Sequence, residues 1–175
     1  MTDYCPTLNA GLTILRPLTA DHADALFSVL RDVHLWRFTE QVPPKTLAGL
    51  RERYQRLESR RSPDGQELWL NWALERREDD RPVGLVQATV PILHSYADIA
   101  YVLGRAFWGR GLAIGAVDAM LDFLRVELHV RTARASVDSR NLPSVRLLER
   151  LGFRIEDATD PSSVWLNKSL LSERA

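Results

Sequence analysis

The sequence is short of cysteine, since Cys5 is the only one among its 175 residues. A single cysteine excludes an intrachain disulfide and a cysteine-based metal site. Histidine is also sparse and scattered without the paired spacing of metal ligands, at His22, His34, His94 and His129. The sequence therefore predicts no bound metal.

An excess of charge of one sign is missing as well. The 23 Lys and Arg residues balance 23 Asp and Glu residues, so the formal net charge is zero and nothing steers the chain toward nucleic acid. No stretch approaches the roughly 18 apolar residues that cross a bilayer, and no basic, then apolar, leader opens the sequence. We therefore expect a soluble cytoplasmic protein that binds neither nucleic acid nor a membrane.

What is present is an ordinary globular composition, 45% hydrophobic and 26% charged. No internal repeat, low-complexity tract or long polar linker divides the chain. A chain of this length buries roughly two-thirds of its unfolded surface around one core. The sequence predicts a single domain over residues 1–175.

Hydrophobic periodicity predicts both strands and helices. Residues 68–75 alternate strictly, which is typical of a strand with one solvent-facing side, and 83–90 should pair with them as an antiparallel hairpin. Further strands are expected at 12–16, 98–103, 130–137, 153–155 and 164–170. Four helices are expected: one after Thr19, one after Thr46, a long one over 113–128, and one between Asn141 and Gly152.

The most informative segment lies between the expected strand at 98–103 and the long helix, where the chain reads Gly104-Arg-Ala-Phe-Trp-Gly-Arg-Gly111. A glycine-bearing loop that opens into a helix gathers free backbone N–H groups at the positive end of the helix dipole, and such a point binds phosphate. Gly109 and Gly111 would let the backbone approach an oxygen closely, and Arg110 would add a positive charge.

Three kinds of phosphate loop compete for this segment. The nucleotide P-loop ends in Gly-Lys-Ser/Thr, which does not occur here. The dinucleotide-binding fingerprint is a stronger rival, because Gly109, Gly111 and Gly115 fit a G-x-G-x-x-x-G variant, as in an NADP-dependent oxidoreductase. Too little chain follows for a second mononucleotide-binding half, so this hypothesis is the less favoured one.

The third kind is the acetyl-CoA loop of the GNAT superfamily, Q/R-x-x-G-x-G/A, which residues 108–113 resemble through Gly111 and Ala113. Trp108 takes the usual Gln or Arg position, and a Trp-Gly-Lys/Arg-Gly version resembles the RimJ/RimL branch, the ribosomal-protein N-terminal acetyltransferases and their relatives. The segments 98–101 (Asp-Ile-Ala-Tyr), 141–144 (Asn-Leu-Pro-Ser) and 148–153 (Leu-Glu-Arg-Leu-Gly-Phe) are similar to further elements of that branch, in the same order. The similarity covers nearly the whole chain.

This resemblance implies an α+β fold in three layers, with a mixed, mostly antiparallel central sheet whose central strands are splayed. It also implies acetyl-CoA as co-substrate, no metal, and direct transfer to an amine acceptor, either a peptide N-terminus or a small molecule. Relatives often form homodimers, so a homodimer is an expectation here. Since direct transfer uses no enzyme thiol, we expect Cys5 to be a bystander near a mobile terminus.

The same resemblance implies which residues bind acetyl-CoA. Backbone N–H groups should bind the pyrophosphate, from Trp108, Gly109, Arg110, Gly111, Leu112 and Ala113. Backbone groups of Tyr101, Val102 and Leu103 should hold the pantetheine arm and polarise the acetyl carbonyl. Asn141 should cap its helix and contact the pantetheine.

Two residues are predicted to be catalytic. Ser144 should protonate the leaving thiolate, because Leu148 stands where many relatives carry a tyrosine; the alternative is a helix-start serine that bonds its own backbone. Asp98 should accept the proton of the amine. Glu156, Asp157 and Asp160 are alternatives for that base.

The acceptor is expected near the aromatic and cationic residues Trp36, Arg37 and Phe38, whereas Trp72 is expected in the core. A polyamine site would need clustered carboxylates, and residues 34–40 offer only Glu40, so a peptide N-terminus is slightly favoured. The missing family tyrosine, together with Gly115 where relatives often carry Glu, leaves open a catalytically weak CoA-binding regulatory module.

Overall fold

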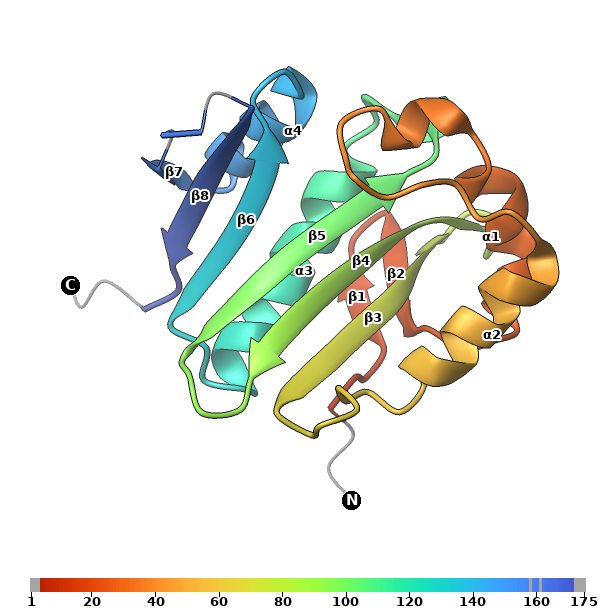
Figure 1. The fold of residues 1–175 in the computed structure, drawn as a ribbon, viewed down its shortest axis with the longest axis horizontal. Helices are drawn as coiled ribbons and strands as arrows, with labels where there is room; N and C mark the ends of the chain where they lie inside the picture. Colours follow the sequence, from red (N-terminus) through yellow and green to blue (C-terminus); the bar gives the residue numbers. More distant parts are fainter. Residues whose placement is uncertain (1–3, 158, 161, 172–175) are drawn as a thin grey trace.

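The computed structural model describes residues 4–157, 159–160 and 162–171. An eight-stranded sheet crosses the molecule in the order β1-β2-β3-β4-β5-β6-β8-β7 (Figure 1). Its strands are β1 (Leu8–Ala10), β2 (Thr13–Pro17), β3 (Glu67–Arg76), β4 (Pro82–Pro91), β5 (Tyr96–Leu103), β6 (Thr132–Asp138), β7 (Arg154–Asp157) and β8 (Ser163–Ser169). Its helices are α1 (His22–Leu30), α2 (Leu47–Leu57), α3 (Leu112–Val126) and α4 (Leu142–Arg150), with short 3-10 turns at Val33–Trp36 and Arg105–Phe107.

The sheet is mixed and mostly antiparallel, as predicted. Among the described strands, only the β5–β6 ladder is parallel. The β3–β4 hairpin and the long helix after the glycine loop are confirmed. The short strand β1, which pairs with β2 at the sheet edge, was not predicted, because three residues are too few to show a periodicity.

Strands β5 and β6 form the predicted splay. Their ladder contains three pairs, of which Asp98 with Arg134 is the last. Beyond it β5 runs on to Leu103 and β6 to Asp138 without pairing to each other, and Figure 1 shows the two ribbons diverging. We call the opening between Ile99–Leu103 and Ala135–Asp138 the fork.

Local signals for the helix ends are confirmed in three cases. The Thr46 hydroxyl accepts a hydrogen bond from the Gly49 N–H at 3.1 Å, and the Asn141 side chain accepts one from the Ser144 N–H at 3.4 Å. Gly152 follows α4 with a φ of 85°. The prediction for Thr19 is wrong: α1 begins only at His22, and the Thr19 hydroxyl lies 2.9 Å from Nδ1 of that histidine.

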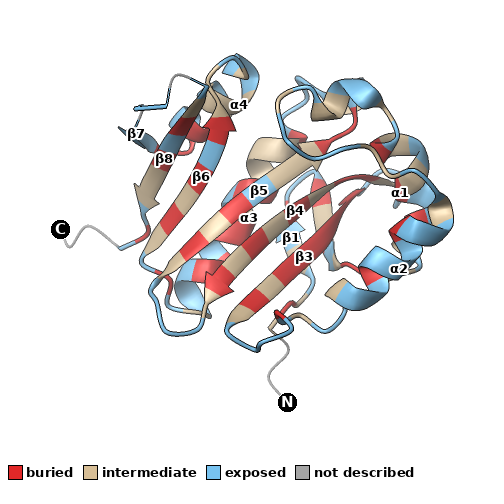
Figure 2. Ribbon diagram, in the orientation of Figure 1, coloured by how far each residue is buried: buried red, intermediate tan, exposed pale blue. Residues whose placement is uncertain are grey.

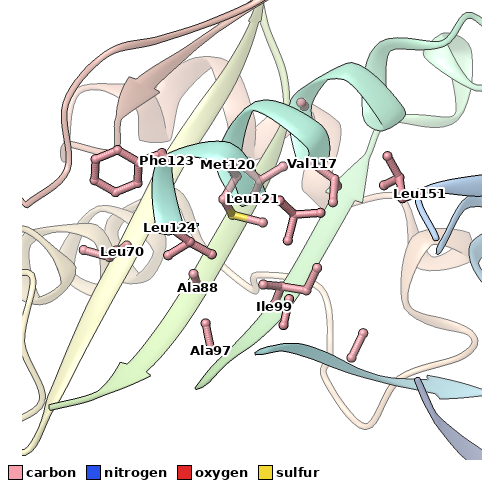
Figure 3. Packing of buried hydrophobic residues seen from close by; sticks show 14 of the residues in the cluster. Leu70, Ala88, Ala97, Ile99, Val117, Met120, Leu121, Phe123, Leu124 and Leu151 are labelled. Atoms are coloured by element: carbon pink, nitrogen blue, oxygen red, sulfur yellow. The ribbon is translucent and has the colours of Figure 1, made fainter. Parts of the chain in front are cut away.

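Both faces of the sheet are covered. On one face α3 packs across the strands, and Figure 3 shows its Met120, Leu121 and Leu124 beside Ala88 and Ile99. On the other face α1 and α2 form a second, smaller cluster with Ala73 and Leu18, so the central strands are largely buried (Figure 2).

This second layer corrects one prediction about the strand at 68–75. The side of this strand that was expected to face solvent is covered, since Asn71, Ala73 and Glu75 are all buried. Alternation in the sequence did not reveal the cover, because α1 and α2 come from earlier in the chain. Trp72, on the opposite face, is fully buried as predicted and packs edge-on against Phe123.

Cys5 was expected near a mobile terminus, but it lies in the main core. It is fully buried, and its Sγ lies 3.4 Å from the carbonyl oxygen of Asn71. The segment before β1 is therefore part of the packed structure from Tyr4 onward, where the description of the chain begins.

Candidate functional site

The glycine loop has the backbone geometry of an anion-binding turn. Gly109 and Gly111 adopt left-handed φ values of 72° and 76°, and Gly111 is the N-cap residue of α3 without a capping side chain. The first N–H groups of a helix have no intrahelical partner, so Leu112 and Ala113 present theirs at the loop. Arg110 is exposed beside them. The arrangement combines free donors, a helix dipole and a positive charge.

Trp108 attaches this loop to the end of β5. Its indole Nε1 donates a hydrogen bond of 2.6 Å to the carbonyl oxygen of Leu103, although the residue is 52% exposed overall. The side chain therefore positions the loop, and the pyrophosphate site that the sequence predicts sits at the open end of the fork.

Gly115 has a packing role. A Cβ built on it would lie 3.0 Å from the carbonyl oxygen of Ala10, so β1 approaches α3 where no side chain intervenes. This contact explains the third glycine of the supposed dinucleotide fingerprint. The mostly antiparallel sheet also differs from the doubly wound parallel sheet to which that fingerprint belongs, and it contradicts the oxidoreductase alternative.

A pair of hydroxyl groups lies across the fork. The Tyr101 Oη on β5 is 2.7 Å from the Ser144 Oγ on α4 and 3.3 Å from the Ser144 carbonyl oxygen. Burial raises the pKa of Tyr101 to about 12, against the opposing effect of the bond to Ser144, so the phenol stays protonated at neutral pH. Leu148, at the position of the family tyrosine, is fully buried and offers no hydroxyl.

The Tyr101 hydroxyl, which faces Ser144, was not predicted, because the resemblance implied a role only for the backbone of that residue. The signal was a tyrosine on the strand before the glycine loop. Its pairing with Ser144, 43 residues later, depends on how α4 packs.

Asp98 is engaged in an ion pair. Arg134 Nε and Nη2 lie 2.8 and 2.9 Å from its two carboxylate oxygens, and the same guanidinium lies over the rings of Tyr96 and Trp165. Since Asp98 and Arg134 are the last paired residues of β5 and β6, their side chains join the two strands where the fork begins. This position argues against the prediction that Asp98 is the general base.

The alternative bases, Glu156, Asp157 and Asp160, lie on β7 and the loop after it, and none lines the cavity described next. The Asp160 carboxylate accepts hydrogen bonds from Ser162 and Ser163, and these bonds lower the pKa of its carboxyl group. None of the four predicted carboxylates lines the cavity, and the one at the base of the fork, Asp98, is paired with Arg134.

A cavity of about 430 Å³ lies between the sheet and the α1–α2 layer and reaches Tyr101, Val102 and Asn141 at the fork. Of the three residues predicted for acceptor binding, only Trp36 lines it; its Nε1 donates to the Leu30 carbonyl oxygen at 2.7 Å. Arg37 and Phe38 do not line it, although the chain returns to the cavity at Thr39 and follows it over residues 41–46. Arg37 and Phe38 instead stack on each other, 4.3 Å from guanidinium carbon to ring centroid.

The inner wall of this cavity is uncharged and carries a few polar groups among apolar side chains. Asn71, Gln87 and Ala100 stand opposite one another across β3, β4 and β5. The Tyr54 hydroxyl on α2 is buried, with no hydrogen-bond partner among the described residues. Burial raises the pKa of Tyr54 well above its usual range, so it is neutral. Tyr54 was not among the predicted site residues, and the only signal for it was a phenol group within the helix expected after Thr46.

The described residues form neither a cluster of metal-ligating side chains nor a membrane-spanning helix. No group of three His, Cys, Asp or Glu side chains could hold a metal ion in the part of the chain that the structure covers. Within the same residues, no helix has the length and apolar character needed to cross a membrane.

Comparison with known proteins gives a consistent result. Residues 13–154 match the family described as "Acetyltransferase (GNAT) domain". The chain is 27% identical over 151 residues to the uncharacterized N-acetyltransferase p20 of Bacillus licheniformis, an alignment that covers 86% of this chain and 83% of that one.

Two solved structures have a similar fold. The spermidine N-acetyltransferase from Vibrio cholerae, in complex with CoA and spermine, gives a TM-score of 0.77 at 17% identity, covering 91% of this chain and 96% of that one. The ribosomal-protein-S5-alanine acetyltransferase from Vibrio fischeri gives 0.78 at 15% identity, covering 97% and 99%. At such identities the likeness establishes the fold, and the names of these neighbours point to two different kinds of acceptor.

Proposed function

The chain belongs to the acetyltransferase (GNAT) domain family, and we propose that it moves an acetyl group from acetyl-CoA directly to a primary amine, as a single catalytic domain of the RimJ/RimL-like branch. One observation carries the proposal. The left-handed glycine loop and the cavity, whose lining contains no carboxylate, both reach the fork between β5 and β6.

Acetyl-CoA would bind along the fork and across the loop. The N–H groups of Leu112 and Ala113, with Arg110, would hold the pyrophosphate, and Gly109 and Gly111 fit it because a Cβ at either would meet only open space. The edge of β5 beyond Asp98 has no strand partner on the β6 side, so its backbone groups are available to the amide-bearing pantetheine arm. The bound thioester supplies the activated acetyl group.

The residues at the fork would then assist the transfer. Backbone N–H groups near Val102 would polarise the acetyl carbonyl. Tyr101, protonated at neutral pH, would donate its proton to the oxygens of Ser144, which leaves the Ser144 hydroxyl proton free to donate to the departing sulfur. One ammonium proton passes to solvent before the attack, since no described carboxylate lines the cavity. The neutral amine nitrogen then bonds to the acetyl carbon as the carbon–sulfur bond breaks and the Ser144 proton moves to the sulfur. The second nitrogen proton, released as the amide forms, restores the Ser144 hydroxyl through solvent.

The test is a thiol-release assay with acetyl-CoA and a panel of amines, preceded by thermal unfolding with CoA, acetyl-CoA or NADP. We expect both CoA ligands, but not NADP, to raise the unfolding temperature, because a ligand specific for the native state stabilises it. We also expect thiol release that requires an amine. Stabilisation by CoA without release on any amine would contradict the proposed catalysis and favour a CoA-binding regulatory module.

A further inference from the structure

The charged groups around the cavity all have one sign. Lys45 and Arg53 are the charged residues that line it, and no described Asp or Glu side chain does. Both cations are exposed, and neither forms an ion pair with a described residue. The mouth of the cavity thus presents two uncompensated positive charges.

Three carboxylates on the surrounding elements have partners elsewhere, and the exposed Glu40 and Glu52, which form no ion pair with a described residue, do not line the cavity. Asp24 of α1 pairs with Arg51, and Asp32 pairs with Arg105 at 3.3 Å. The carboxylate of Glu58, after α2, accepts a hydrogen bond from the Ala20 N–H at 2.6 Å. None of these three carboxylates lines the cavity, so none would offset the charge at its mouth.

The interior supplies hydrogen bonds without charge. Tyr54 is only 1% exposed, and its hydroxyl has no hydrogen-bond partner among the described residues. A buried hydroxyl without a partner lowers the free energy of unfolding, so a ligand that bonds to it would be stabilised. The Gln87 side chain lines the same wall as Asn71. These groups match the carbonyl and N–H groups of an amide or carboxylic acid better than they match a second ammonium group.

We propose that the acceptor is a primary amine that carries a carboxylate on an otherwise uncharged body, such as an α-amino acid or a short peptide, and not a polyamine. The inference rests on the proposed acetyl transfer. The carboxylate would face Lys45 and Arg53, whereas the second ammonium of a polyamine would face the same charges without a counter-ion. A peptide α-amine also loses its proton near pH 8, roughly two units below a lysine-like amine, which suits a cavity without a carboxylate base.

The first experiment compares matched acceptors. Thiol release is measured with the dipeptide Ala-Phe, with its C-terminal amide, with free phenylalanine and with spermidine. We expect kcat/KM for the better of the two carboxylated amines to exceed that for the amide by about tenfold, a typical effect of one charge-assisted hydrogen bond. Spermidine should be the poorest. Phenylalanine and Ala-Phe separate the free amino acid from the peptide, and equal or better use of the amide or spermidine would overturn the inference.

The second experiment uses charge variants with a matched control. Lys45→Gln and Arg53→Gln should each reduce the preference for carboxylate over amide by about threefold or more, since both groups are partly solvated. Arg56 is an exposed arginine on α2, like Arg53, but does not line the cavity. Arg56→Gln should therefore keep the preference for carboxylate over amide. Equal preference in all four proteins would overturn the assignment of these two cations.

Tyr54→Phe tests the interior independently of charge. Removal of an unpartnered buried hydroxyl should leave the unfolding temperature unchanged or raise it. The same change should weaken binding of Ala-Phe by about threefold to tenfold, as expected when one hydrogen bond is lost. A variant that unfolds at lower temperature yet binds Ala-Phe as tightly as the wild type would show that the hydroxyl serves the fold instead.

Isothermal titration calorimetry with the same ligands separates failure of this inference from failure of the proposed function. Tighter binding of Ala-Phe than of its amide, without thiol release, would support the acceptor class while contradicting catalysis. Efficient acetylation of spermidine would support catalysis and overturn the acceptor class. Absence of detectable binding for all four ligands to the CoA-loaded protein would also overturn it.

Discussion

The Tyr101 Oη and the Ser144 Oγ, 43 positions apart in the chain, lie 2.7 Å from each other across the fork. One hydroxyl comes from β5 and the other from the first turn of α4. A strand and a helix that approach the same point in this way place two polar hydrogens where a leaving sulfur would need one. In the proposed mechanism the pair would take the place of the tyrosine that many family members carry at the position of the buried Leu148.

Ser144→Ala is expected to lower kcat by about a hundredfold, the lower range for loss of a general acid, with little change in acetyl-CoA affinity. Tyr101→Phe should lower kcat less, by about tenfold, because the serine remains. Since the two act as a unit, the double variant should be no worse than Ser144→Ala. Steady-state kinetics and CoA titration measure these effects, and wild-type turnover in Ser144→Ala would remove the residue from the mechanism.

Gly111→Ala should weaken acetyl-CoA binding through backbone strain alone. The residue has a φ of 76°, and a Cβ there would meet no atom within 4 Å. Gly65, in the turn before β3, has a φ of 72° and the same open space, so Gly65→Ala is a matched control. Both variants should lose about 1 kcal/mol of folding free energy, but only Gly111→Ala should lose CoA affinity by calorimetry. Equal CoA affinity in both variants would contradict the assigned loop.

Asp98→Asn should affect the fold more than the chemistry. Loss of the pair with Arg134 is expected to lower the free energy of unfolding by about 0.5 kcal/mol, a small value because both side chains are partly solvated. Arg134→Gln should cost a similar amount, and the double variant little more. The pH dependence of kcat/KM should keep its shape, whereas loss of its acidic limb in Asp98→Asn would restore Asp98 as the base.

The protein is expected to lose stability at alkaline pH. The pKa of Tyr101 is about 12 in the folded state and about 10 in an unfolded chain, so above pH 10 the unfolded chain loses this proton first. The stability that comes from keeping Tyr101 protonated is fully present below pH 10. It declines as the pH rises to 12, by up to about 2 kcal/mol. Denaturant titrations between pH 10 and pH 12 should show that the free energy of unfolding declines less steeply in Tyr101→Phe than in the wild type. An identical decline would contradict the raised pKa of Tyr101.

Much of the fold could be predicted because its signals are local. The 3-to-4-residue spacing of Val117, Met120, Leu121 and Leu124 predicts the buried face of α3, and all four are buried. The caps at Thr46 and Asn141 depend on groups within three residues and were equally predictable. Prediction failed for the covered side of β3, since the helices above it are remote in sequence.

The site was only partly predictable for the same reason. The resemblance located the glycine loop, Asn141 and Ser144, because these lie in short motifs. It did not indicate that Asp98 pairs with Arg134, 36 positions away, or that Phe38 lies outside the cavity. No short sequence pattern predicts that the cavity beside Tyr54 lacks carboxylates, since the residues that line it come from widely separated segments.

The sequence by itself determined most of the secondary structure, the glycine loop before α3 and the family, because these depend on short local patterns. Tertiary structure alone decided which hydroxyl groups meet, which carboxylate is neutralised and which charges line the cavity. Each of these is a contact between distant segments, and its geometry arises only when β5 and β6 diverge and the helices pack on the two faces of the sheet.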